Sequence, residues 1–162
     1  MKKYFLLLFL GFTCTLHAQL IKLDVQYVEQ EEIDWCSAAC SKCVLDYKGI
    51  GKTQCHIMEY IRNNSFGYGS INCCSKPVLF CNKGVPLGID NERGSVKDIL
   101  WHFGELPCKG FWNSLAPSGI EDNIKRNCPL IVQWNYLNNP YAHTVVIFGI
   151  EKKNSIDNSW CI

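Results

Sequence analysis

The 162-residue chain has little net charge and little that repeats. Its 16 Lys and Arg residues nearly balance its 15 Asp and Glu residues, so the formal net charge is +1. This balance gives no electrostatic reason to expect nucleic-acid or membrane-surface binding. The sequence contains no internal repeat and no low-complexity segment, and its composition is that of an ordinary globular protein.

Long apolar runs are missing after residue 18, so no later stretch is predicted to cross a membrane. Residues 1–18 themselves combine a short basic start, an apolar run over residues 4–12 and a small final residue, Ala18. This is the pattern of a secretory signal peptide, with cleavage expected after Ala18. A membrane anchor is disfavoured because a spanning helix needs ~20 apolar residues. Cys14 leaves a lipoprotein open, although the residues before it do not resemble a lipidation site.

Cleavage would leave residues 19–162 as one domain of 144 residues, long enough to bury a substantial core. Periodicity predicts helices first and strands last. After an entry strand at 19–28, helices are expected over residues 34–47, 52–62, 95–104 and 118–127, and strands over 130–136, 144–151 and 156–162. This order predicts an α+β fold with an antiparallel sheet at the C-terminal end.

Cysteine is abundant, with 11 in the whole chain and ten after the leader. The ten are Cys36, Cys40, Cys43, Cys55, Cys73, Cys74, Cys81, Cys108, Cys128 and Cys161. In an exported chain they predict disulfides. We expect at least two, drawn mainly from the six cysteines around the irregular stretch 63–94, namely Cys55, Cys73, Cys74, Cys81, Cys108 and Cys128. Spacing does not decide the connectivity.

Two other uses of these cysteines stay open. Cys40 and Cys43 share a helix face with Cys36, and either can be a small core residue. Zinc is the other alternative, because Cys40-x-x-Cys43 and the Cys73-Cys74 pair with Cys81 offer suitable ligand atoms. Zinc is disfavoured because adjacent cysteines do not suit a tetrahedral site.

Residues 30–40 bring together a nucleophile and a hydrogen-bond donor. Asp34 is expected to cap a helix whose first turn carries Cys36, where the helix dipole favours a thiolate. Gln30, six residues before Cys36, offers a side-chain amide donor. A nucleophile beside an amide donor is typical of an acyl-transfer site. The competing interpretations are half of a disulfide for Cys36 and a solvated surface residue for Gln30.

A candidate base and its orienting residue lie far downstream. His143 opens an apolar, β-branched run and is expected at the start of a buried strand. Asn158 follows fifteen residues later, and an Asn after the His orients the imidazole in a Cys-His-Asn site. The alternatives are a core histidine for His143, and Asp157 or a backbone carbonyl as the orienting group.

In this order of Gln, Cys, His and Asn the chain resembles the papain-like cysteine peptidases. The motifs that carry the likeness are Trp35-Cys36, Cys55, Cys73-Cys74, Cys81-Asn82, residues 129–132 and residues 143–149. The chain is similar to the branch that contains bacterial avirulence-effector peptidases and, more distantly, to bacteriocin leader peptidases. The similarity covers most of the chain after residue 25. Ser37 departs from that branch, which often has a second Trp there.

The resemblance implies a papain-like α+β fold, in which N-terminal helices carry Cys36 and a C-terminal antiparallel sheet carries His143. It implies a cysteine peptidase with Cys36 as nucleophile, His143 as base and Gln30 in the oxyanion hole. Asn158 is our candidate for the orienting residue, although the third member in that branch usually lies a little further past the His. With the leader, these residues predict an exported enzyme. We expect no cofactor or metal, a peptide or protein substrate, and no nucleic-acid or membrane partner after cleavage. The chain is expected to be a monomer, secreted or periplasmic in a bacterium.

Three other functions fit parts of the pattern. A Cys-His cell-wall amidase or endopeptidase shares the Cys and His arrangement but usually lacks the upstream Gln. A disulfide-stapled binding domain without catalysis would have an oxidised Cys36. A transglutaminase-like acyl transferase would incorporate amines. Thiol labelling of the native chain separates an enzyme from a binding domain.

Overall fold

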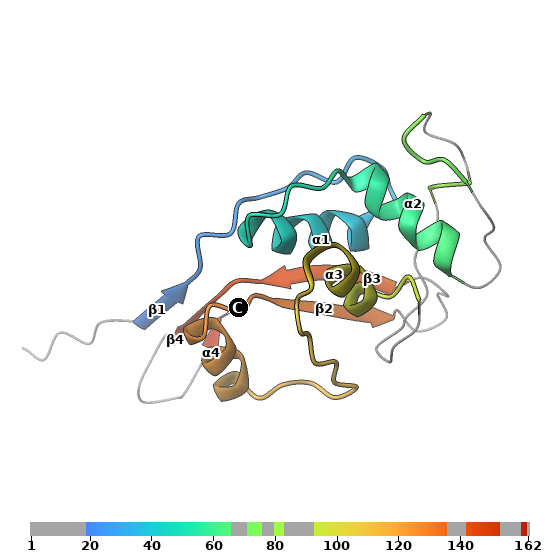
Figure 1. Ribbon diagram of the computed structural model, residues 1–162. Helices are drawn as coiled ribbons and strands as arrows, with labels where there is room; N and C mark the ends of the chain where they lie inside the picture. Colours follow the sequence, from blue (N-terminus) through green and yellow to red (C-terminus); the bar gives the residue numbers. More distant parts are fainter. Residues whose placement is uncertain are drawn as a thin grey trace, which may run out of the picture.

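A two-stranded antiparallel ladder with helices on both faces forms the middle of the molecule (Figure 1). The structure is a computed structural model that describes residues 19–65, 71–75, 80–82, 93–135, 142–152 and 160–161. Over this part of the chain the elements are β1 (Gln19–Lys22), α1 (Cys36–Tyr47), α2 (Gln54–Asn64), α3 (Val96–Gly104), α4 (Pro117–Lys125), β2 (Leu130–Asn135), β3 (Ala142–Ile147), β4 (Gly149–Lys152) and β5 (Trp160–Cys161). The α+β prediction is confirmed. The predicted leader, 1–18, lies outside the described residues.

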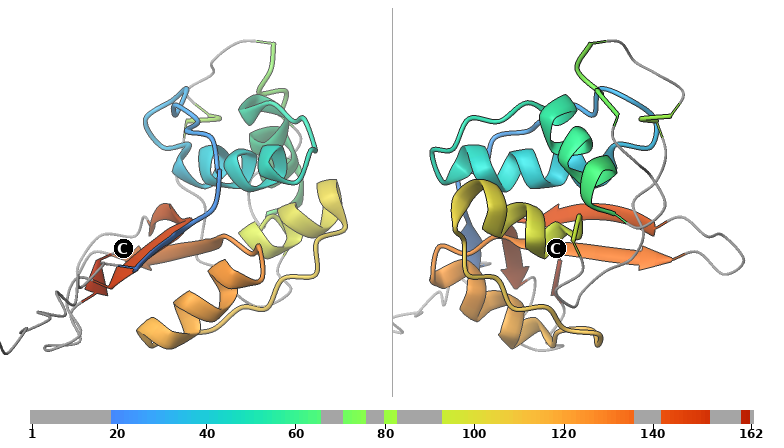
Figure 2. Two further views of the ribbon diagram at one scale, coloured as in Figure 1. Left: turned by 90° about the vertical axis from the view of Figure 1, so that its left-hand side faces the viewer. Right: turned by 45° about the vertical axis from the view of Figure 1, so that its right-hand side comes forward.

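The helices lie on both sides of the ladder because its strands are apolar on both faces. Ile131 and Val146 pack against the core formed by α1, α2 and α3. Leu130 and Ile147, the neighbouring residues, pack into the cluster that contains α4. Successive side chains of a strand point to opposite faces, so each strand supplies both cores. Figure 2 shows the same layers from two further directions, with α1 and α2 on one side and α4 on the other.

The C-terminal strands form two small sheets instead of the one that was expected. β2 pairs with β3, whereas β4 pairs with β1 and β5. The strand predicted over 144–151 is divided at Phe148, whose carbonyl accepts a hydrogen bond from the Leu23 N–H at 2.8 Å. The chain therefore changes partners at this residue, from β2 to the N-terminal strand. All three pairings are antiparallel, as predicted.

The predicted cap of α1 is wrong by one residue. The helix begins at Cys36 with Trp35 at the N-cap position, and no side chain caps it. The N–H of Asp34 donates to Asn82 Oδ1 at 2.9 Å, so this residue is tied to a neighbouring segment. At the other end Gly49 has a φ of +78° and ends the helix where expected, because glycine tolerates this left-handed conformation.

Two disulfides staple the irregular region after α2. Cys55 is bonded to Cys74, and Cys73 to Cys81, with sequence separations of 19 and 8 residues. The prediction of at least two disulfides from this group is confirmed. The zinc alternative that used Cys73, Cys74 and Cys81 is wrong, because sulfurs joined in disulfides cannot act as thiolate ligands. Among the described residues, no helix is long and apolar enough to cross a membrane.

Candidate active site

Side-chain hydrogen bonds join the first turn of α1 to the start of β3. Ser37 Oγ lies 2.9 Å from Thr144 Oγ1, and Gln133 Nε2 donates to these two oxygens at 3.4 and 3.2 Å. Ser37 and Thr144 are only 1% and 3% exposed, so each hydroxyl depends on this junction for its hydrogen bonds. Cys36 and His143 directly precede Ser37 and Thr144. The junction therefore brings the backbones of the two candidate catalytic residues to the same place.

Cys36 is the first residue of α1 and is half-buried. The first N–H groups of a helix point out of its N-terminal end, so the Cys36 backbone has the direction that an oxyanion donor needs. Neither described disulfide involves Cys36, and its side chain is a thiol. The position suits a nucleophile that approaches its substrate from the helix end.

Cys40 lies one turn further along α1 and is a packing residue. Its thiol donates to the backbone carbonyl of Thr144 at 3.3 Å. Burial, followed by the neighbouring Cys36 and Cys43 thiols, raises the pKa of Cys40 from 9.0 to about 12. Burial also raises the pKa of Cys43, whose thiol donates to the Gln26 carbonyl. Both thiols therefore stay protonated near neutral pH, which leaves them poor nucleophiles beside Cys36.

His143 lies on β3 directly opposite Trp134 on β2. Their rings meet edge to face, with centroids 5.2 Å apart and planes at 72°. Because Gln133 and Thr144 face α1, the pleat of the strands places Trp134 and His143 on the other face. The His143 side chain is exposed and lies on the face of the ladder away from α1, the helix that carries Cys36. The edge-to-face contact with Trp134 therefore helps to orient the His143 ring.

Gln30 lies in the turn that leads into α1 and is half-buried. Its Nε2 donates to the backbone carbonyls of Glu32 and Ile33. The same Glu32 carbonyl accepts from the Trp35 N–H at 3.1 Å, so the Gln30 amide is part of the turn itself. An amide group has two donor hydrogens, and both are engaged here. To bind an oxyanion, Gln30 would have to release one of these carbonyls.

The sequence-based interpretation missed the contacts that fix this turn from the other side. The indole Nε1 of Trp35, whose side chain is 3% exposed, donates to the Cys81 carbonyl at 2.8 Å. Asn82 accepts from the Asp34 N–H, and the disulfide to Cys73 holds Cys81. The Cys81-Asn82 pair was noticed only as part of a family resemblance, because nothing in its spacing indicates a contact 46 residues away. Asn158 and Asp157 lie outside the described residues, so the third catalytic member stays a prediction.

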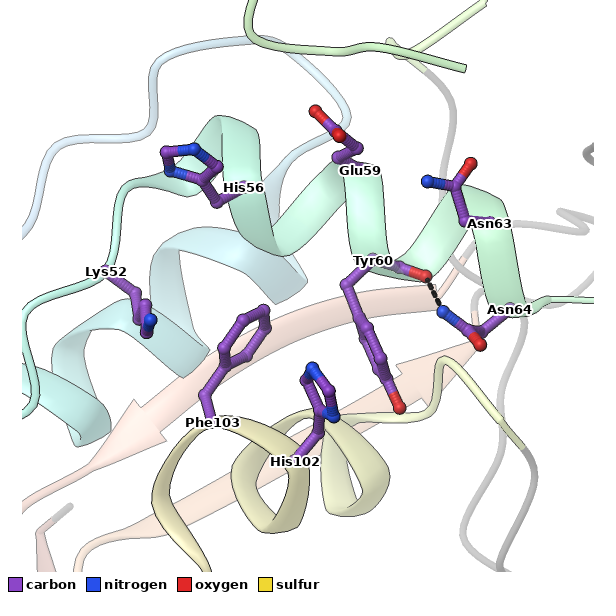
Figure 3. A pocket seen from close by; sticks show the side chains of 8 residues that line it. All are labelled: Lys52, His56, Glu59, Tyr60, Asn63, Asn64, His102 and Phe103. Atoms are coloured by element: carbon purple, nitrogen blue, oxygen red, sulfur yellow. Dashed lines mark hydrogen bonds between the residues drawn. The ribbon is translucent and has the colours of Figure 1, made fainter. Parts of the chain in front are cut away.

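The described residues also form a hollow of about 310 Å³ between α2 and α3 (Figure 3). It is lined by Lys52, His56, Glu59, Tyr60, Asn63, Asn64, His102 and Phe103, and contains none of the candidate catalytic residues. Its two histidines already have partners. His56 Nδ1 lies 2.7 Å from Thr53 Oγ1, and the His102 ring stacks on Tyr60 with centroids 4.0 Å apart.

One cluster has the residue types of a metal site. The ligand atoms of Cys55, His56 and Cys74 all lie within 4.8 Å of one another. The two sulfurs are bonded to each other, however, so they offer no thiolate to a metal. This cluster does not fit a metal ion in its oxidised form.

Comparison with protein families finds a match over most of the chain. The model of a family described as the Peptidase_C39 like family matches residues 22–160. This range includes all four candidate site residues, from Gln30 to Asn158. The comparison with curated proteins finds no match, and neither does the comparison with solved structures.

Proposed function

The chain belongs to the Peptidase_C39-like family, and from this premise we propose that it is an exported papain-like cysteine peptidase that hydrolyses peptide bonds. The observation that carries the proposal is the hydrogen bond between Ser37 and Thr144 at 2.9 Å. It ties the residue after Cys36 to the residue after His143, and so supports the proposal by holding the backbones of the proposed nucleophile and base close together. The reaction itself requires the imidazole to reach the Cys36 thiol. Ser37 and Thr144 are 107 positions apart in the chain and meet where α1 packs on β3.

In the proposed reaction, His143 removes the proton of the Cys36 thiol, and the thiolate attacks the carbonyl carbon of the scissile bond. The negative charge moves to the carbonyl oxygen. The Cys36 backbone N–H and the Gln30 amide stabilise this oxyanion, an effect typically worth ~3 kcal/mol per donor. Gln30 exchanges one backbone carbonyl of its turn for the oxyanion, so the hydrogen bond that it gives up is offset by the stronger one that it makes to the charged oxygen.

The second half of the reaction returns the enzyme to its starting state. His143 gives its proton to the leaving amine, which leaves a thioester between Cys36 and the acyl part of the substrate. Water, deprotonated by His143, attacks the thioester and releases the acid. Asn158, or Asp157 in its place, orients the imidazole during both transfers.

Export is part of the proposal. The leader pattern of residues 1–18 is the first support for it. The second is the pair of disulfides, Cys55–Cys74 and Cys73–Cys81, because such bonds persist in oxidising compartments. The substrate is a peptide or protein, and the relation to the effector-peptidase branch remains part of this proposal.

Hydrolysis of a fluorescence-quenched casein tests the proposed function. Cys36→Ser and His143→Ala should each lower turnover by ~10³-fold or more, because each removes a member of the reacting pair. Cys128→Ser is the matched control, since it removes an exposed thiol away from the junction and should leave turnover unchanged. Retention of wild-type turnover by Cys36→Ser would remove the basis of the proposal.

A further inference from the structure

The first residue of α2, Gln54, contacts the segment that carries Gln30. Its side chain is 1% exposed and both ends of its amide are engaged. Nε2 donates to the Glu29 carbonyl at 2.6 Å, and Oε1 accepts from the Glu31 N–H at 3.2 Å. The two bonds lie on either side of Gln30. A buried polar side chain with both partners in one backbone segment fixes that segment tightly.

The two hydrogen bonds between Gln54 and the backbone of Glu29 and Glu31 have the pattern that a neighbouring β-strand would make with this segment. In extended backbone, the carbonyl of one residue and the N–H two residues later point to the same side. Gln54 occupies that side with a single amide group and sets the direction of the residue between the two contacts. That residue is Gln30, whose own amide donates to the carbonyls of Glu32 and Ile33 in front of Cys36.

We propose that Gln54 is a positioning residue, which holds Gln30 at the place where its amide can reach an oxyanion formed at Cys36. This inference rests on the proposed peptidase function. Gln54 does not touch the reacting atoms and acts only through the Glu29–Glu31 backbone. It extends the site to α2, which none of the four candidate residues occupies.

A double-mutant cycle separates this role from a purely structural one. Gln54→Met keeps the length of the side chain and removes both hydrogen bonds. It should lower casein turnover severalfold to a hundredfold in the wild-type background. In the Gln30→Ala background, which itself lowers turnover by ~10²–10³-fold, it should have no further effect on turnover. An equal loss in both backgrounds would overturn the proposal, because Gln54 would then act independently of Gln30.

Hydrogen exchange provides a readout that does not depend on activity. The Glu31 N–H should exchange at least ~10-fold faster in Gln54→Met, while the amides of α1 keep their protection. The control is Ile57→Val, a fully buried change one turn along α2 that loosens the same helix without touching these bonds. Unchanged exchange at Glu31 would overturn the proposal, even if turnover falls.

The two measurements also distinguish failure of this inference from failure of the proposed function. If Cys36→Ser retains activity, the peptidase mechanism fails, and with it the catalytic purpose of Gln54. Hydrogen exchange at the Glu31 N–H would then still show whether the Gln54 side chain holds the Glu29–Glu31 backbone. If Cys36→Ser is inactive but the cycle is additive, the peptidase stands and the positioning role is wrong.

Discussion

The segment that leads into Cys36 and the strand that carries His143 are held in different ways. The segment from Glu29 to Trp35 is fixed by the Gln54 amide, by Asn82 and by the disulfide-bonded Cys81. His143 is exposed and contacts Trp134, and its strand meets α1 through the next residue, Thr144.

The two halves of the site, the segment before Cys36 and the strand with His143, therefore depend on different interactions. On the Cys36 side, covalent bonds and buried hydrogen bonds set the geometry before substrate arrives. On the His143 side, the backbone is positioned by the Ser37–Thr144 junction, and the ring orientation is left to its neighbours. Loss of the Cys73–Cys81 disulfide should therefore act mainly on stability, whereas a change at the Ser37–Thr144 junction should act on catalysis as well.

The largest expected effect on stability comes from the disulfide nearest the Cys36 side. Cys73→Ser combined with Cys81→Ser removes one staple and should lower the free energy of unfolding by about 2–4 kcal/mol. Urea denaturation measures this change. Both residues are nearly or fully buried, so the introduced hydroxyls add to the cost. An unchanged unfolding midpoint would show that the Cys36 side does not depend on this staple.

A smaller effect is expected at the junction between the two halves. Thr144→Val preserves shape but removes the hydroxyl, which leaves the buried Ser37 with a long bond to Gln133. We expect a loss of about 1–2 kcal/mol in unfolding free energy and a fall in casein turnover, because the separation of Cys36 and His143 is no longer fixed. Thr53→Val, at an exposed cap, is the control for turnover. A loss of stability without any change in turnover would show that the Ser37–Thr144 junction does not affect catalysis.

The smallest effect is a pH dependence that belongs to Cys40. Its pKa is raised from 9.0 to about 12, so the folded state binds its proton more tightly than the unfolded state does. The stability that the folded state gains from this tighter proton binding is fully present below pH 9 and is lost as the pH rises toward 12. When the pH rises from about 8 to 10, the free energy of unfolding of the wild type should therefore fall by about 1 kcal/mol more than that of Cys40→Ala. Urea titrations at the two pH values measure this difference, and parallel losses would contradict it.

Much of the fold could be predicted because local signals and tertiary structure agree. Ser95 caps α3, and Gly49 ends α1, at the positions that the sequence indicates. Disulfides were expected because so many cysteines surround one irregular stretch, although their pairing depends on contacts that spacing does not encode. The α1 cap was misplaced because the Asp34 backbone is tied to Asn82, a tertiary contact.

The sequence indicates candidate residues for the site, and their roles stay predictions, but it does not indicate the contacts that support them. Cys36 and His143 are signalled by their local sequence, a helix start and a strand start. Gln54 is not, because a glutamine in the first turn of a helix is ordinarily solvated, and only the packing of α2 on the Glu29–Glu31 backbone buries it. Gln30 was expected to point at the oxyanion. Its bonds to the carbonyls of Glu32 and Ile33 are an outcome of the turn that no sequence pattern reveals.

The most direct test of the account is labelling of the native protein with a thiol-directed epoxide at neutral pH, with the modified residue identified by mass spectrometry. We predict that Cys36 is labelled first and that His143→Ala slows its labelling by ~10²-fold, because the base no longer takes the proton. Alkylation of the exposed Cys128 by iodoacetamide should proceed equally in both proteins and serves as the internal control. Labelling of Cys36 at the same rate with and without His143 would contradict the pairing of these two residues.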